Sequence, residues 1–126
     1  MKVLVDTSVW VGHFKHRDER LVALLQAGLV ACHPYVVVEV ACGTPPHRRD
    51  VIDMLGALDS VPIATADELL ALLQRRVLFG RGCGFVDLSL LASALLGEQT
   101  WVWTLDKRLA AIATELALAY RPALAS

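Results

Sequence analysis

Four acidic residues of this 126-residue chain stand in apolar surroundings, where a carboxylate is costly. They are Asp6 at the end of KVLVD, Glu39 within YVVVEVAC, Asp87 after GFV and Asp106 after WVWTL. Taking an ion out of water costs several kcal/mol unless the ion is paired or bound to a metal. Because acids cannot neutralise one another, the four together indicate a shared cation.

The residue types suggest which cation this would be. A carboxylate cluster without a neighbouring His or Cys suits Mg²⁺ or Mn²⁺, which prefer oxygen ligands, and disfavours zinc. At a phosphodiester, such an ion generates the nucleophile, neutralises the non-bridging oxygens and stabilises the leaving oxygen. The net charge of −1 argues against broad binding of a polyanion, so phosphate would be held locally by the metal and a few basic residues.

Each acid also has a simpler interpretation. Asp6 and Asp106 could each cap a following helix, and Glu39 could face solvent from an edge strand or an amphipathic helix. Their combination favours a common site over these separate roles. The basic residues that could touch phosphate are expected to be solvated surface instead: Arg48, Arg49, Arg81, Lys107 and Arg108.

The elements that must position these acids follow from the apolar pattern. The run up to Asp6 predicts a buried strand, and further strands are expected at residues 29–32, 61–64, 100–104 and, weakly, 118–120. Helical periodicity and end signals predict helices at residues 18–27, 48–58, 65–79, 86–97 and 106–117. Residues 34–42 stay undecided, because the valines favour a strand while Pro34 and Gly43 suit the two ends of a helix.

Alternating strands and helices predict an α/β fold. We expect a single-domain α/β/α sandwich over residues 1–126, with a central, mostly parallel sheet of about five strands. In such Rossmann-like sheets, ligands bind beyond the carboxyl ends of the strands, where Asp6 and Asp106 stand. Asp87 would lie in the first turn of a helix, whose dipole favours an anion.

Composition narrows the class of protein further. The hydrophobic fraction is 56% and the mean hydropathy is +0.51, yet no apolar run reaches the ~20 residues that span a bilayer. Asp6 also cuts the N-terminal apolar run short of a secretion signal, so we expect a cytoplasmic protein without membrane contact. Cys32, Cys42 and Cys83 lack zinc-ligand spacing and are expected to be reduced packing thiols.

The order of these motifs resembles a known family. An apolar strand into D-T-S, a lone Glu in an apolar segment, G-R-G-C-G-F-V-D before an apolar helix and T-L-D-K-R-L together resemble the PIN-domain nucleases. The likeness is greatest to the VapC-type toxins of type II toxin–antitoxin pairs, and it covers essentially the whole chain.

The resemblance implies a function and a site. It implies a PIN-like fold with Glu39 on a helix, and cleavage of single-stranded RNA with Mg²⁺ or Mn²⁺. The implied partners are a cognate VapB-type antitoxin and a second copy of the chain in a homodimer. The implied acidic site is Asp6, Glu39, Asp87 and Asp106, with polar support from Thr7, Ser8 and Thr104.

Our hypothesis divides the work among the acids. Asp6 and Asp87 bind the principal metal ion, Asp106 orients a water or a second ion, and Glu39 assists. One alternative is a PIN-like module that binds RNA or a protein without cleavage. Another is a receiver-type signalling domain, but that class needs an adjacent acidic pair after the first strand, where this chain has Thr7 and Ser8.

Overall fold

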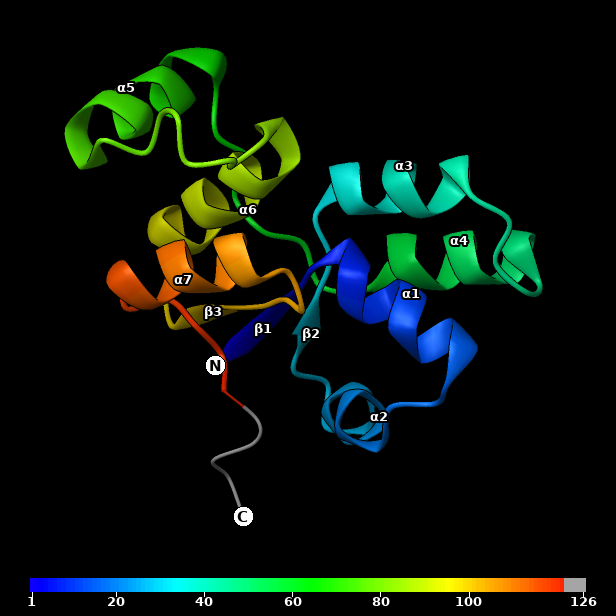
Figure 1. Ribbon diagram of the computed structural model, residues 1–126. Helices are drawn as coiled ribbons and strands as arrows, with labels where there is room; N and C mark the ends of the chain where they lie inside the picture. Colours follow the sequence, from blue (N-terminus) through cyan, green and yellow to red (C-terminus); the bar gives the residue numbers. More distant parts are fainter. Residues whose placement is uncertain (122–126) are drawn as a thin grey trace.

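Parallel strands form the centre of the molecule, and helices lie on both sides of them (Figure 1). The computed structural model describes residues 1–121. In chain order the elements are β1 (Lys2–Val5), α1 (Thr7–Lys15), α2 (Glu19–Gln26), β2 (Val30–Ala31), α3 (Pro34–Cys42), α4 (Arg48–Ala57), α5 (Ala66–Arg76), α6 (Phe85–Leu96), β3 (Thr100–Trp103) and α7 (Lys107–Glu115). The predicted α/β class is therefore confirmed.

The sheet has the order β2-β1-β3, and both pairings are parallel. Val3 pairs with Val30 on one side and with Trp101 on the other. Because β1 lies between its two neighbours, its residues Val3, Leu4 and Val5 are fully buried. In Figure 1, α1, α3 and α4 lie together on one side, and α5, α6 and α7 lie on the other.

The prediction of about five strands was too high, since the sheet has three. Two isolated parallel bridges extend its edges, Ala31 to Asp59 and Val102 to Ala119. Residues 61–64 do not form the expected strand, because Pro62 has no N–H for a ladder and the chain leaves the sheet after Asp59. Residues 118–120 contribute only the bridge at Ala119.

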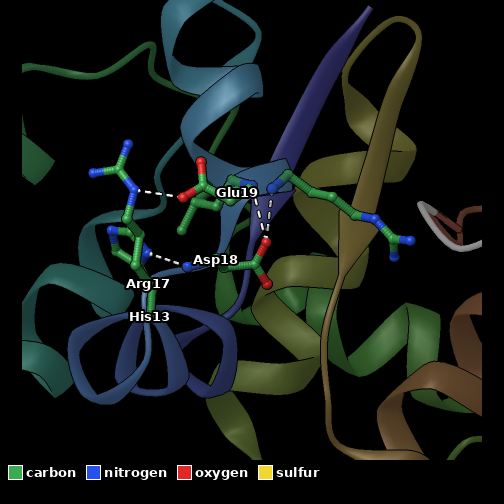
Figure 2. A network of polar contacts seen from close by, with 6 residues as sticks. His13, Arg17, Asp18 and Glu19 are labelled. Carbon is green, nitrogen blue, oxygen red and sulfur yellow. Dashed lines mark hydrogen bonds and ion pairs between the residues drawn. The ribbon is translucent and has the colours of Figure 1, made fainter.

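Local signals explain where the helices begin. Thr65 and Glu68 form the predicted capping box at the start of α5. At the start of α2, Asp18 Oδ1 accepts from the amides of Arg20 and Leu21. Figure 2 shows this corner, where the Asp18 amide also donates to His13 Nδ1 at 2.9 Å.

One hydrophobic core joins the two sides of the sheet. Its fully buried side chains include those of Trp10 from α1, Leu21 from α2, Leu55 from α4, Leu90 from α6 and Ile112 from α7, besides those of β1. None of the helices in residues 1–121 combines the length and the apolar character that crossing a bilayer requires.

Candidate active site

Asp6 ends β1 and begins α1, and it is only 6% exposed. Its Oδ2 accepts hydrogen bonds from the hydroxyls of Ser8 and Thr104, both at 2.7 Å. The Ser8 amide also donates to Oδ2, at a longer 3.4 Å. Asp6 therefore caps α1 weakly, and two hydroxyl groups fix the direction of its carboxylate.

The residues that follow β3 form hydrogen bonds with the same two hydroxyl groups. Thr104 Oγ1 accepts from the Asp106 amide at 3.0 Å while it donates to Asp6. Ser8 Oγ accepts from the Leu105 amide at 3.0 Å. The two hydroxyls thus join the carboxyl ends of β1 and β3 and hold the Asp6 carboxylate.

Asp106 caps α7, the role that its position before Lys107 suggested. Its Oδ1 accepts from the amides of Arg108 and Leu109, at 2.9 and 3.0 Å. Its place right after β3 and its capping role are compatible, because a cap uses only one of the two carboxylate oxygens. The second oxygen is left to face another group.

Glu39 lies on α3, so the undecided segment is a helix. Pro34 occupies the first turn, and the fully buried His33 caps the helix by accepting from the Tyr35 amide at 3.0 Å. The Thr7 hydroxyl, from the first turn of α1, donates to Glu39 Oε1 at 2.6 Å. Because Thr7 directly follows Asp6, this bond links Glu39 to the start of α1 beside Asp6.

Asp87 lies in the first turn of α6, where its Oδ2 accepts from the Gly84 amide at 3.3 Å. Burial raises the pKa of Asp87, the Gly84 amide opposes that rise, and the charges of Asp6, Asp106 and Glu39 raise the pKa further. Because these charges act on Asp87 together, the structure brings all four predicted acids into one neighbourhood.

The four carboxylates share one pattern. Each has one oxygen in a hydrogen bond, namely Asp6 Oδ2, Glu39 Oε1, Asp87 Oδ2 and Asp106 Oδ1. No hydrogen bond within residues 1–121 reaches the other oxygen of any of them. The same stretch contains no group of three or more His, Cys, Asp or Glu side chains already arranged to hold a metal ion. Repulsion between unneutralised carboxylates favours such an open arrangement.

The loop before α6 completes the surroundings. Arg81 donates to both carboxylate oxygens of Glu115, at 2.6 and 2.7 Å, and so attaches this loop to the end of α7. Burial, Asp87 and Asp106 raise the pKa of Cys83 to about 11, and Arg81 opposes them. The thiol therefore stays protonated near neutral pH, which makes it a poor metal ligand. Cys42 is exposed, so the expectation that all three cysteines pack inside was wrong for that residue.

Comparisons with known proteins agree with this picture. The family model described as "PIN domain" matches residues 3–115. Ribonuclease VapC32 of Mycobacterium tuberculosis, from strains CDC 1551 / Oshkosh and ATCC 25618 / H37Rv, is 46% identical over 117 residues, which are 93% of this chain and 94% of that protein. The chain therefore belongs to the PIN-domain family and, within it, to the VapC proteins, as its motifs predicted.

A solved structure shows the same fold at greater distance. The crystal structure of PAE2754 from Pyrobaculum aerophilum matches with a TM-score of 0.60 at 19% identity, over 93% of this chain and 90% of that one. At this identity the likeness concerns the fold alone.

Proposed function

We propose that this chain is the toxin of a type II toxin–antitoxin pair and hydrolyses RNA phosphodiester bonds at the four acids, with Mg²⁺ or Mn²⁺. The observation that carries the proposal is that Asp6, Glu39 and Asp106 act on Asp87, whose pKa is raised first by burial and further by these three charges. Crowded negative charge of this kind is what a divalent cation offsets. The reaction class is supported by the name of the relative, Ribonuclease VapC32.

The ligand chemistry fits Mg²⁺ or Mn²⁺. Each acid is oriented through one oxygen and offers the other, and hydrogen bonds that orient a ligand raise the metal affinity of many sites. All four candidate ligands are oxygen donors, the kind these ions prefer. Asp6 and Asp87 would hold the principal ion, and Asp106 would hold a water or a second ion.

Individual residues then have separate tasks. A bound Mg²⁺ or Mn²⁺ would neutralise charge on the phosphate and make a bound water more acidic. Asp106 orients the attacking water through Oδ2, since Oδ1 caps α7. Glu39, held by the Thr7 hydroxyl, assists through its Oε2. Ser8 and Thr104 keep Asp6 in position while the substrate binds.

A cleavage assay tests the reaction. The purified protein is incubated with an unstructured oligoribonucleotide in Mn²⁺, in Mg²⁺ and in EDTA, and the products are separated by size. We expect cleavage in either metal, no cleavage in EDTA, and loss of cleavage in Asp87→Asn, which keeps the shape of the side chain. Cleavage in EDTA, or undiminished cleavage by the variant, would contradict the proposal.

The biological role has its own test. The proposed partners are RNA as substrate, a VapB-type antitoxin, and a second copy of the chain. Expression of the wild type should arrest growth, and co-expression of the small protein encoded beside it should restore growth. Asp87→Asn should be harmless alone. Arrest by Asp87→Asn equal to that by the wild type would separate toxicity from the acids.

A further inference from the structure

Two aromatic side chains meet on the surface next to the acids. The rings of Tyr35 and Phe85 have centroids 5.3 Å apart and planes at 36°. Tyr35 is 37% exposed and Phe85 is 60% exposed. Such a pair presents a large apolar face to water, an arrangement with no evident benefit for folding.

The pair bridges the two helices that carry acids from opposite sides of the sheet. Tyr35 lies in the first turn of α3, four residues before Glu39 and therefore on the same face of that helix. Phe85 is the first residue of α6, two residues before Asp87, and directly follows Gly84, whose amide holds the Asp87 carboxylate. The aromatic pair therefore lies beside the acidic site.

Both rings stand on well-fixed backbone. The Tyr35 amide donates to the buried His33, and the Tyr35 ring packs against the His33 ring with centroids 4.8 Å apart. The Phe85 carbonyl accepts from the Ser89 hydroxyl at 2.8 Å. A surface held in this way loses little conformational freedom when a flat ligand packs on it.

The side chain of Arg108, from α7, lies against the loop before Phe85. A Cβ added to Gly82 would stand 2.8 Å from Cδ and Nη1 of Arg108, so the Arg108 side chain runs across that glycine. Within residues 1–121, Arg108 forms no ion pair. Aromatic faces beside an available cation are the combination that binds single-stranded nucleic acid, because bases stack on the rings while the cation contacts phosphate.

We infer that Tyr35 and Phe85 form a stacking platform for an unpaired base next to the phosphodiester that the acids cleave, with Arg108 beside it for the backbone. This inference rests on the proposed function. Two rings match the size of a base, whereas a stable protein interface needs roughly 800 Å² from each partner. Glu39 and Asp87 of the proposed reaction site lie on the same two helices as the rings, so a base stacked here keeps its own phosphate within reach.

Phe85→Leu removes the aromatic face and retains apolar bulk. Because base stacking contributes about 1–3 kcal/mol, we expect the KM for an unstructured oligoribonucleotide to rise about 5- to 140-fold. Phe85→Trp keeps an aromatic face and should raise the KM much less than Phe85→Leu does. The matched control is Phe79→Leu, since Phe79 is 59% exposed on the same loop without a described ring partner. It should leave the KM unchanged, and circular dichroism should give all three variants the wild-type melting temperature.

A second measurement does not need cleavage. In EDTA, binding of the oligoribonucleotide should quench the added fluorescence of Phe85→Trp, whereas duplex RNA of the same sequence should quench it much less. Unquenched fluorescence together with an unchanged KM in Phe85→Leu would overturn the inference while cleavage by the wild type still supported the nuclease. Absence of cleavage by the wild type would instead overturn the proposed function, and quenching would still report on stacking.

A protein partner on the same face is the other result that would overturn the inference. If Phe85→Leu bound and cleaved RNA like the wild type but lost its complex with the co-expressed antitoxin, the aromatic pair would be a protein contact. Analytical size-exclusion chromatography of the two co-expressed complexes makes that comparison.

Discussion

At the scale of single residues, Asp6 joins the strand, the helix and the site. Its carboxylate is buried at the end of β1, yet it accepts two short hydrogen bonds from Ser8 and Thr104. Hydrogen bonds to a charged acceptor are stronger than those between neutral groups, which makes the burial tolerable. All of these bonds reach Oδ2, and no hydrogen bond within residues 1–121 reaches Oδ1.

Thr104→Val tests whether these hydroxyls position the metal ligand. Valine keeps the shape of threonine but cannot donate to Asp6 or accept from the Asp106 amide. Loss of a hydrogen bond that orients a ligand typically weakens metal affinity about 10- to 100-fold, so we expect a rise of that size in the Kd for Mn²⁺. Isothermal titration calorimetry measures it.

The control for this change is Thr100→Val. Thr100 begins the same strand, is buried, and donates to the Glu98 carbonyl at 3.1 Å at the opposite end of the sheet. Thr100→Val should lose a comparable hydrogen bond without any change in the affinity for Mn²⁺. Equal Kd values for the two variants would show that Thr104 does not position Asp6 for the metal.

At the scale of elements, α3 shows what propensity alone does not decide. Four valines favour a strand, but the penalty for a β-branched residue in a helix is under about 1 kcal/mol each. Val36 and Val40 lie one helical turn apart and are both buried, so packing against the neighbouring helices outweighs that penalty. That packing depends on distant parts of the chain, which is why the family resemblance predicted the helix and local sequence did not.

The cap of α3 makes stability depend on pH. Burial lowers the pKa of His33 below its ordinary 6.5. The neutral ring accepts from the Tyr35 amide through Nδ1, which a protonated ring could not do. Between that lowered pKa and 6.5, the unfolded chain binds more protons than the folded chain. The free energy of unfolding should therefore be fully retained above pH 6.5 and fall as the pH decreases below it.

Urea unfolding at pH 7.5 and pH 5.5 measures this effect. His33→Asn keeps a capping acceptor without the titrating ring, so its midpoint should change less between the two pH values than that of the wild type. His16→Asn removes an exposed histidine and should retain the wild-type pH dependence. An unaltered pH dependence in His33→Asn would assign the effect to other groups.

In the loop before α6, replacing Gly82 should cost more stability than replacing Gly84. Gly82 has φ +80, and a Cβ there would stand 2.8 Å from two atoms of Arg108, whereas Gly84 has an extended backbone with open space around its Cα. Gly82→Ala should therefore lower the free energy of unfolding by about 1–2 kcal/mol through backbone strain, and further where Arg108 cannot move. Urea unfolding measures the loss.

Two further variants separate strain from steric clash. Gly84→Ala should change stability little. Gly80 has φ +74, and a Cβ added there would meet nothing within 4 Å. Gly80→Ala should therefore show the cost of backbone strain without a steric clash. If Gly82→Ala were as stable as Gly84→Ala, the positive φ and the Arg108 contact would have no energetic role.

At the scale of the whole molecule, topology explains why the ends of β1 and β3 are the expected place for a site. With the two edge bridges, the spatial order runs from Asp59 through β2, β1 and β3 to Ala119, so the chain order reverses at β1. Ligands of open α/β sheets bind beyond such a reversal, which is where Asp6 and Asp106 stand. In Figure 1 the strands run toward the region between α3 and α6.

Other parts of the site could not be derived in the same way. Glu39 and Asp87 lie on helices, and no local rule gives how those helices pack relative to the strand ends. The contact between Tyr35 and Phe85 depends on the same packing, so no sequence pattern singles out either residue. A physical rule therefore predicts from sequence that acids at strand ends lie near a ligand site. The positions of groups on helices can be predicted only from the fold or from a family pattern.

The stability of the whole chain should respond to metal. A ligand that binds only the folded state at 100 times its Kd adds about 2.7 kcal/mol, which for a domain of this size raises the melting temperature by roughly 10 °C. Mn²⁺ should raise the melting temperature of the wild type by this order and that of Asp6→Asn by much less, because the variant lacks one proposed ligand. Asp53→Asn removes an exposed acid of α4 and should respond like the wild type. Differential scanning calorimetry at fixed Mn²⁺ and in EDTA makes the comparison, and equal shifts in the wild type and Asp6→Asn would remove the reason for placing the metal at the end of β1.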